Sequence, residues 1–172
     1  MEKGQLNKLQ SFLETPKSIV IVPHRNPDGD AMGSTLALCQ YFNSKNHIAT
    51  VLAPNEYPEF LHWLPGSKNV ILFDKQNKQA KRTIENSDII FLLDFNGLHR
   101  VGDDMANTLS EYKNEFVMID HHQQPDGIAA YLYSDVSICS TAQMVYHFLE
   151  MLDDTNSISK EMATCLYTGI MT

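Results

Sequence analysis

Three short apolar runs, each followed directly by acidic or histidine side chains, constrain the fold of this chain more than any other feature. The run at 18–22 is followed by His24, the run at 87–93 by Asp94, and the run at 115–119 by Asp120. Segments that are apolar throughout are typical of strands buried on both faces of a parallel sheet. Because the carboxyl ends of parallel strands lie at one edge, we expect these side chains to converge despite their separation in sequence.

The rest of the chain alternates strand-like with helix-like segments. Further strands are expected at 47–52, 69–73 and 131–133, and helices at 5–14, 31–43, 56–64, 76–86, 105–112, 140–152 and from 159 onward. Strand and helix alternating across short connections is the pattern of right-handed βαβ crossovers. The sequence therefore predicts an α/β fold with a mostly parallel, doubly wound sheet and helices on both faces.

Length and composition narrow the class of protein. A chain of 172 residues with 43% hydrophobic residues can bury one core, so we expect a single domain over residues 1–172. No apolar run approaches the roughly 20 residues needed to cross a bilayer. The N-terminal residues lack an apolar signal core, which predicts a cytoplasmic protein without membrane association.

Charge and cysteine content exclude two kinds of site. The formal net charge of −8 disfavours a broad basic surface for nucleic acid, although bound cations would still allow a phosphate-bearing substrate. Cys39, Cys139 and Cys165 are scattered without the Cys-x-x-Cys spacing. This pattern argues against a disulfide framework and against a zinc-thiolate site, and we expect all three thiols to fill the core.

The stretch from 23 to 30 carries the densest group of candidate ligands. His24, Asp28 and Asp30 fall within seven residues, and the intervening Asn-Pro-Asp-Gly sequence favours a sharp turn that brings them around one point. The alternative is an ordinary strand-to-helix turn with Asp30 as N-cap. Gly33 would either permit a close approach by backbone or ligand, or be a merely tolerated helix glycine.

The combined set of candidate ligands suits hard cations. Its members are His24, Asp28, Asp30, Asp94, Asp120, His121 and His122. Imidazole and carboxylate groups without thiolate favour Mn²⁺, with Mg²⁺ as the alternative. Seven groups exceed the needs of one ion, so we expect two ions about 3.5–4 Å apart, bridged by Asp94. Such a pair hydrolyses phosphate esters or anhydrides.

The same motifs resemble those of a known family. His24-x-Asn-Pro-Asp28-Gly-Asp30-Ala-x-Gly33-Ser, then Asp94, then Asp120-His121-His122, then Thr-Gly-Ile-Met-Thr at 168–172, resemble the DHH phosphoesterase superfamily, especially its bifunctional oligoribonuclease and pAp phosphatase type. The resemblance covers nearly the whole chain. It implies the fold of a DHH catalytic domain.

The resemblance also implies a role for each residue. One Mn²⁺ would be held by His24, Asp28 and Asp94, and the second by Asp30, Asp94 and His121. His122 would contact the substrate phosphate, and Asp120 would orient a histidine. Arg100, six residues after Asp94, is a further candidate for substrate contact, with an ordinary exposed arginine as the alternative.

The family pattern places a further aspartate ligand just after the 169–172 segment and a C-terminal DHHA1 substrate-binding domain beyond it. We therefore expect this chain to be a catalytic-domain fragment that binds its second ion weakly. The expected substrates are short single-stranded oligoribonucleotides and 3′-phosphoadenosine 5′-phosphate, and a homodimer is possible. Alternatives are an exopolyphosphatase or pyrophosphatase, a cyclic-dinucleotide phosphodiesterase, and a non-catalytic metal- or nucleotide-binding module.

Overall fold

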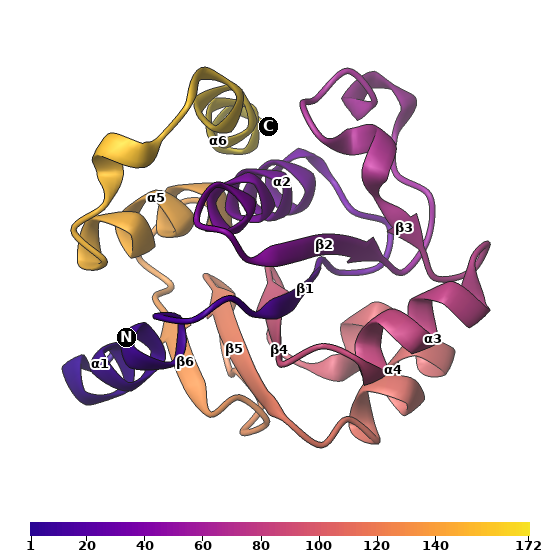
Figure 1. Ribbon diagram of the computed structural model, residues 1–172. Coiled ribbons are helices and arrows are strands. Elements are labelled where there is room, and N and C mark those ends of the chain that lie inside the picture. Colours follow the sequence, from indigo (N-terminus) through magenta and orange to yellow (C-terminus); the bar gives the residue numbers. More distant parts are fainter.

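A parallel sheet of six strands forms the centre of the computed structural model, which describes all of residues 1–172 (Figure 1). The strand order is β3-β2-β1-β4-β5-β6, and every neighbouring pair is parallel. The strands are β1 (Ser18–Val22), β2 (Ile48–Ala53), β3 (Ile71–Leu72), β4 (Ile89–Leu93), β5 (Glu115–Asp120) and β6 (Tyr131–Ser134). The predicted α/β fold is confirmed, and the expected edge strand is β6.

Six α-helices accompany the strands, and no α-helix lies between β2 and β3 or between β5 and β6. They are α1 (Lys3–Phe12), α2 (Gly29–Ser44), α3 (Asn77–Glu85), α4 (Asp103–Ser110), α5 (Thr141–Met151) and α6 (Lys160–Met171). Asp28, not Asp30, caps α2, because its Oδ1 accepts the backbone N–H of Ala31 at 3.1 Å. Asp30 lies in the first turn, and this leaves its carboxylate available to another element.

The two faces of the sheet are covered by different helices. One hydrophobic layer joins α1, α2, α5 and α6 to side chains such as Ile19, Phe91 and Ile119. The other joins α3 and α4 to the alternate side chains, such as Val20, Leu92 and Met118. Because successive side chains of a strand point to opposite faces, one uniformly apolar run supplies both layers.

The strand order places the candidate site. β1 lies between β2 and β4, so the chain winds outward in one direction from β1 to β3 and in the other from β4 to β6. Open α/β sheets bind ligands outside the carboxyl ends of the strands at such a switch point. β1, β4 and β5 are neighbours there. These are the three strands that the predicted ligands follow.

Helix α2 is buried on most of its circumference, because α6 and α5 pack against the side that faces away from the sheet. A Cβ atom at Gly33 would lie 2.5 Å from the carbonyl oxygen of Cys165 and 2.9 Å from the Cα of Gly169 in α6. Gly33 therefore permits the backbones of two helices to approach each other, the first of its two predicted roles.

The segment between β2 and β3 differs from the prediction. The helix expected at 56–64 is a single 3₁₀ turn at Glu59–Leu61, and a second 3₁₀ turn spans Ser67–Asn69. Each proline disfavours a helical conformation of the residue before it, so Pro58 and Pro65 confine helical structure to the residues between them. The strand expected at 69–73 shortens to the two residues of β3, and a further 3₁₀ turn spans Leu98–Val101.

The prediction for the cysteines was wrong at one position. Cys165 is buried and Cys39 is half-buried, but Cys139 is exposed. Cys139 immediately precedes Ser140, the N-cap of α5, and its thiol donates to Oε1 of Gln143 at 3.1 Å, so it does not join the core.

Among the helices, none combines the length and the apolar composition that spanning a bilayer requires.

Candidate metal centre

A cleft of about 440 Å³ opens at the carboxyl ends of β1, β4 and β5. It is lined by seven of the eight predicted site residues, namely His24, Asp28, Asp30, Asp94, Arg100, His121 and His122. Cys139 and Ser140, just before α5, and residues 169–172 at the end of α6 complete the lining. The structure therefore brings together residues that follow β1, β4 and β5 with residues from the ends of α2, α5 and α6.

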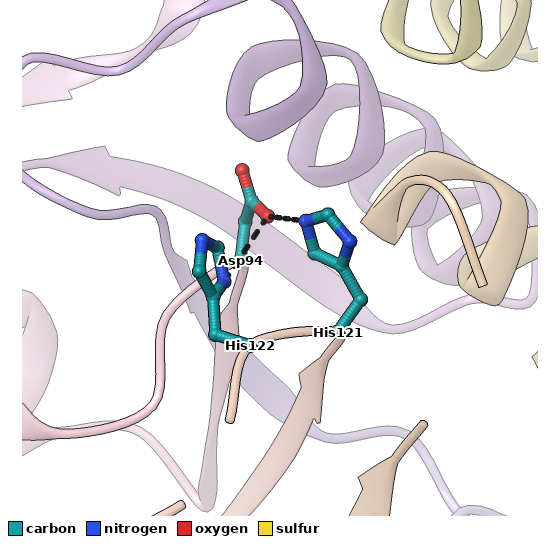
Figure 2. A group of neighbouring side chains, drawn as sticks. All are labelled: Asp94, His121 and His122. Atoms are coloured by element: carbon teal, nitrogen blue, oxygen red, sulfur yellow. Dashed lines mark ion pairs between the residues drawn. The ribbon is translucent and has the colours of Figure 1, made fainter. Parts of the chain in front are cut away.

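Asp94 lies at the centre of this cluster. Its Oδ1 atom is 3.4 Å from Nε2 of His121, and its Oδ2 atom is 3.6 Å from Nε2 of His24. Figure 2 shows the rings of His121 and His122, which follow β5, on either side of one Asp94 oxygen. The side chain is only 3% exposed. One carboxylate thus faces ligands from both sides of the cleft.

The backbone at Asp94 is in the left-handed region, with φ of +68°, and its N–H donates to the carbonyl oxygen of Ile119 at 3.1 Å. A non-glycine residue adopts this conformation at a cost, and such residues cluster at functional sites. The turn directs the side chain into the cleft immediately after β4. The sequence offered no signal for this conformation beyond the position of Asp94 at the end of an apolar run.

Each of the three histidines is anchored through Nδ1. The acceptors are the carbonyl oxygen of Arg25 for His24 at 2.8 Å, that of Ile138 for His121 at 3.2 Å, and the Oδ1 atom of Asp120 for His122 at 2.7 Å. A carbonyl oxygen cannot donate, so the proton of the neutral ring lies on Nδ1. This leaves Nε2 with a free lone pair, the arrangement in which metal-binding histidines are usually held.

Asp120 is the one predicted site residue that does not line the cleft. Its side chain is fully buried, and Oδ2 has no hydrogen-bond partner. Its Oδ1 atom accepts the Nδ1–H of His122. A buried carboxylate with one partner fixes both the tautomer and the orientation of that ring.

The first turn of α5 holds Asp30. The backbone N–H groups of Thr141 and Ala142 donate to its Oδ2 and Oδ1 atoms, each at 2.7 Å. The hydroxyl of Thr141 donates to Oδ1 of Asp94 at 2.8 Å. Ser140 caps this helix, because its Oγ accepts the N–H of Gln143 at 3.1 Å. Sequence reasoning missed Thr141, because only the fold reveals which carboxylates face that turn.

The crowding of charges shifts the ionisation of the cluster. Burial disfavours the charged form of Asp94, but the adjacent imidazoles of His121 and His24 outweigh it and lower the pKa of Asp94 to about 2. Burial, followed by the charge of Asp94, raises the pKa of Asp30 to about 7. The bond to Asp94 raises the pKa of His121 to about 9. Without a cation, the cluster therefore retains protons at neutral pH.

Two groups of ligand atoms share Asp94. His24, Asp28 and Asp94 form one, and Asp94, His121 and His122 form the other. The first is the expected trio. In the second, it is Nδ1 of His122 that faces Asp94, at 4.0 Å, and this atom already donates to Asp120, whereas Oδ2 of the expected ligand Asp30 lies 3.8 Å from Nε2 of His121. The carboxylates and the free Nε2 atoms of His24 and His121 fit hard divalent cations on both sides of Asp94.

Comparison with known proteins gives the family. The model of the DHH family, N-terminal domain, matches residues 18–170. A crystal structure of an exopolyphosphatase-related protein from Bacteroides fragilis is similar over 99% of this chain and 50% of that chain, with 37% sequence identity and a TM-score of 0.95. The fold of this chain and that of the matched part of the Bacteroides fragilis protein are therefore nearly identical.

Two curated relatives are more distant. The cyclic-di-AMP phosphodiesterase PdeA of Listeria monocytogenes is 23% identical over 95% of this chain and 26% of its own length. The probable bifunctional oligoribonuclease and PAP phosphatase NrnA of Streptococcus mutans is 26% identical over 90% of this chain and 44% of its own length. The chain thus spans less than half the length of either relative.

The order of the motifs, the α/β fold and the match over 18–170 lead to one conclusion. This chain belongs to the DHH family and carries its N-terminal domain.

Proposed function

We propose that this chain is the catalytic part of a phosphoesterase that uses two divalent cations, with Mn²⁺ preferred, to hydrolyse phosphate esters. The observation that carries the proposal is Asp94, whose carboxylate belongs to both groups of ligand atoms in one cleft. A shared carboxylate is the usual bridge of a two-metal site. The NrnA and PdeA likenesses support phosphoesterase activity.

Particular residues would hold each ion. His24, Asp28 and Asp94 would hold the first, and Asp94, His121 and one further ligand would hold the second. We propose Asp30 for this ligand, as the family resemblance implies, because its Oδ2 lies 3.8 Å from Nε2 of His121 and because Nδ1 of His122 already donates to Asp120. The ions would supply Lewis acidity, a water of lowered pKa and compensation for the charge of the substrate phosphoryl group.

His122 and Arg100 would act on the substrate directly, and Asp120 through His122. Asp120 accepts the Nδ1–H of His122, so a proton bound at the opposite ring nitrogen can be donated to a phosphoryl oxygen or transferred to the leaving oxygen. Arg100 is exposed and lines the cleft, where its guanidinium can pair with a phosphate. Asp120, His122 and Arg100 are thus proposed to position and neutralise the substrate.

For the substrate, we propose short single-stranded oligoribonucleotides and 3′-phosphoadenosine 5′-phosphate, as the NrnA likeness suggests. A second candidate is a cyclic dinucleotide, which the PdeA likeness favours, and a third is polyphosphate or pyrophosphate, because of the exopolyphosphatase-related structure. We further propose that the protein is cytoplasmic, that it forms a homodimer, and that a substrate-binding domain belongs to the whole protein in addition to this chain.

A substrate panel tests this assignment. Purified protein with Mn²⁺ is incubated with pApA, pAp, polyphosphate and cyclic di-AMP, and phosphate and nucleotide products are quantified against a reaction containing EDTA. We expect hydrolysis of pApA and pAp that EDTA abolishes. Hydrolysis of cyclic di-AMP or polyphosphate alone would support one of the other candidates. Tight Mn²⁺ binding without turnover of any substrate would support the non-catalytic module.

The raised pKa values predict a pH dependence of metal binding. Below a pH of about 7 Asp30 holds a proton, and below about 9 His121 does, so Mn²⁺ must displace both. We expect Mn²⁺ affinity to increase as the pH rises from about 6 to about 9. Isothermal titration calorimetry in buffers of different ionisation enthalpy measures the affinity and the protons released.

The Asp30→Asn variant is the control for this pH dependence, since an amide has no proton to displace in this range. Its affinity should rise less steeply with pH than that of the unmodified protein. An affinity that stays constant between pH 6 and 9 in the unmodified protein would contradict the prediction.

A further inference from the structure

The two central carboxylates reach the cleft from different elements and need a common support. Asp30 comes from the first turn of α2, whereas Asp94 follows β4. Each side chain is negatively charged when ionised, and the negative charge of Asp94 opposes the ionisation of Asp30. Neither side chain donates a hydrogen bond to the other. Their spacing is therefore set by a third element.

Thr141 is the residue that contacts both carboxylates. Its backbone N–H donates to Oδ2 of Asp30 at 2.7 Å, and its side-chain hydroxyl donates to Oδ1 of Asp94 at 2.8 Å. Thr141 is fully buried, so water does not compete for either bond. One residue thus ties the α2 side of the cleft to the β4 side.

The packing around Thr141 leaves it little freedom. Ser140 caps α5 through the N–H of Gln143, and the N–H of Ala142 holds the second oxygen of Asp30. A Cβ atom on Gly169 of α6 would lie 2.6 Å from the Cβ of Ala142. Since α6 presses against the first turn of α5, the hydroxyl of Thr141 is held at a fixed place relative to Asp94.

We propose that Thr141 is a positioning residue that fixes the separation of the Asp30 and Asp94 carboxylates and thereby the separation of the two cations. This inference rests on the proposed function, because it concerns the same metal centre. Thr141 is not proposed as a ligand, since its hydroxyl donates its proton to Asp94. It acts through the two carboxylates, as supporting residues of metal sites do.

The test compares three substitutions by Mn²⁺ titration. Thr141→Val keeps the shape of the side chain but removes the hydroxyl, whereas Thr141→Ser keeps the hydroxyl. Thr35→Val makes the same change at another buried threonine, whose hydroxyl donates only to carbonyl oxygens within α2. Calorimetry gives the number and affinity of bound ions, and thermal unfolding without metal gives the stability of each variant.

We expect Thr141→Val to weaken Mn²⁺ binding at one site by about 10- to 100-fold, or to reduce two bound ions to one. Thr141→Ser and Thr35→Val should bind as the unmodified protein does. An unchanged number and affinity of ions in Thr141→Val would overturn this inference alone. Equally weakened Mn²⁺ binding in Thr35→Val would also overturn the inference, because the loss of any buried hydroxyl would then weaken the metal centre. Absence of Mn²⁺ binding in the unmodified protein would overturn the proposed function as well.

Discussion

The Asp94→Asn variant is expected to lose at least about 10³-fold of the Mn²⁺-dependent hydrolysis, equivalent to about 4 kcal/mol of transition-state stabilisation. Asp94 is the one residue common to both groups of ligand atoms, so its amide analogue weakens both cation positions at once. Asparagine keeps the size of the side chain and an oxygen that accepts from Thr141, but it lacks the negative charge.

Asparagine is preferred to alanine at this position because of the backbone. Asp94 has a φ of +68°, a conformation that asparagine adopts more readily than most residues. Removing the charge relieves the repulsion with Asp30 when no metal is bound, but it also removes the attraction to His121 and His24 that lowers the pKa of Asp94. The variant should remain folded, with a thermal unfolding temperature somewhat below that of the unmodified protein.

Asp88→Asn is the matched control for Asp94→Asn. Asp88 precedes the same strand, β4, at its opposite end, where its Oδ2 accepts the N–H of Ser18 at 2.7 Å. This substitution should leave hydrolysis unchanged. Activity in Asp94→Asn comparable to the unmodified protein would refute the bridging role of Asp94. An unfolded Asp94→Asn variant would show that the residue serves the fold instead.

The second large effect concerns stability. Gly33→Ala should destabilise the protein by about 1–3 kcal/mol, the usual cost of forcing an extra carbon into a packed interior. The new Cβ would lie 2.5 Å from the Cys165 carbonyl oxygen, and its neighbours are backbone atoms of α6 that cannot rotate away. The helices α2 and α6 would have to separate. Chemical denaturation, followed by circular dichroism, measures the loss.

Gly4→Ala provides the opposite expectation. Gly4 lies in α1, and no atom would come within 4 Å of an added Cβ there. Alanine is favoured over glycine in a helix by up to about 1 kcal/mol, so this variant should be as stable as the unmodified protein or more stable. A Gly33→Ala protein as stable as Gly4→Ala would show that α2 and α6 are not in close contact.

The apolar runs made much of the fold predictable. Residues 18–22 and 115–119 are apolar on both faces, which fits only strands covered by helices on each side, and β1 and β5 are such strands. The helix expected at 56–64 failed for a local reason. Pro58 and Pro65 disfavour a helical backbone at the residues before them, and a single 3₁₀ turn forms at Glu59–Leu61.

Most candidate ligands were found from sequence because they lie directly after an apolar strand, and Asp28 and Asp30 because they lie in the turn and the helix start that follow the first such strand. Their convergence in the cleft follows from parallel strands having their carboxyl ends at one edge. The supporting contacts have no such property. Nothing in the local sequence of Thr141 indicates that its hydroxyl faces Asp94, and nothing near Ile138 indicates a bond to His121.

The sequence by itself determined the type of most elements and the set of side chains delivered to one edge of the sheet, because periodicity and chain order depend on neighbouring residues. Only the tertiary structure decided which atoms of that set face each other. Asp28 caps α2, whereas Asp30 turns toward α5. Asp94 adopts a left-handed conformation, with His24 near one of its oxygens and His121 and His122 near the other. These choices depend on how α2, α5 and α6 pack, and packing joins residues that are distant in the chain.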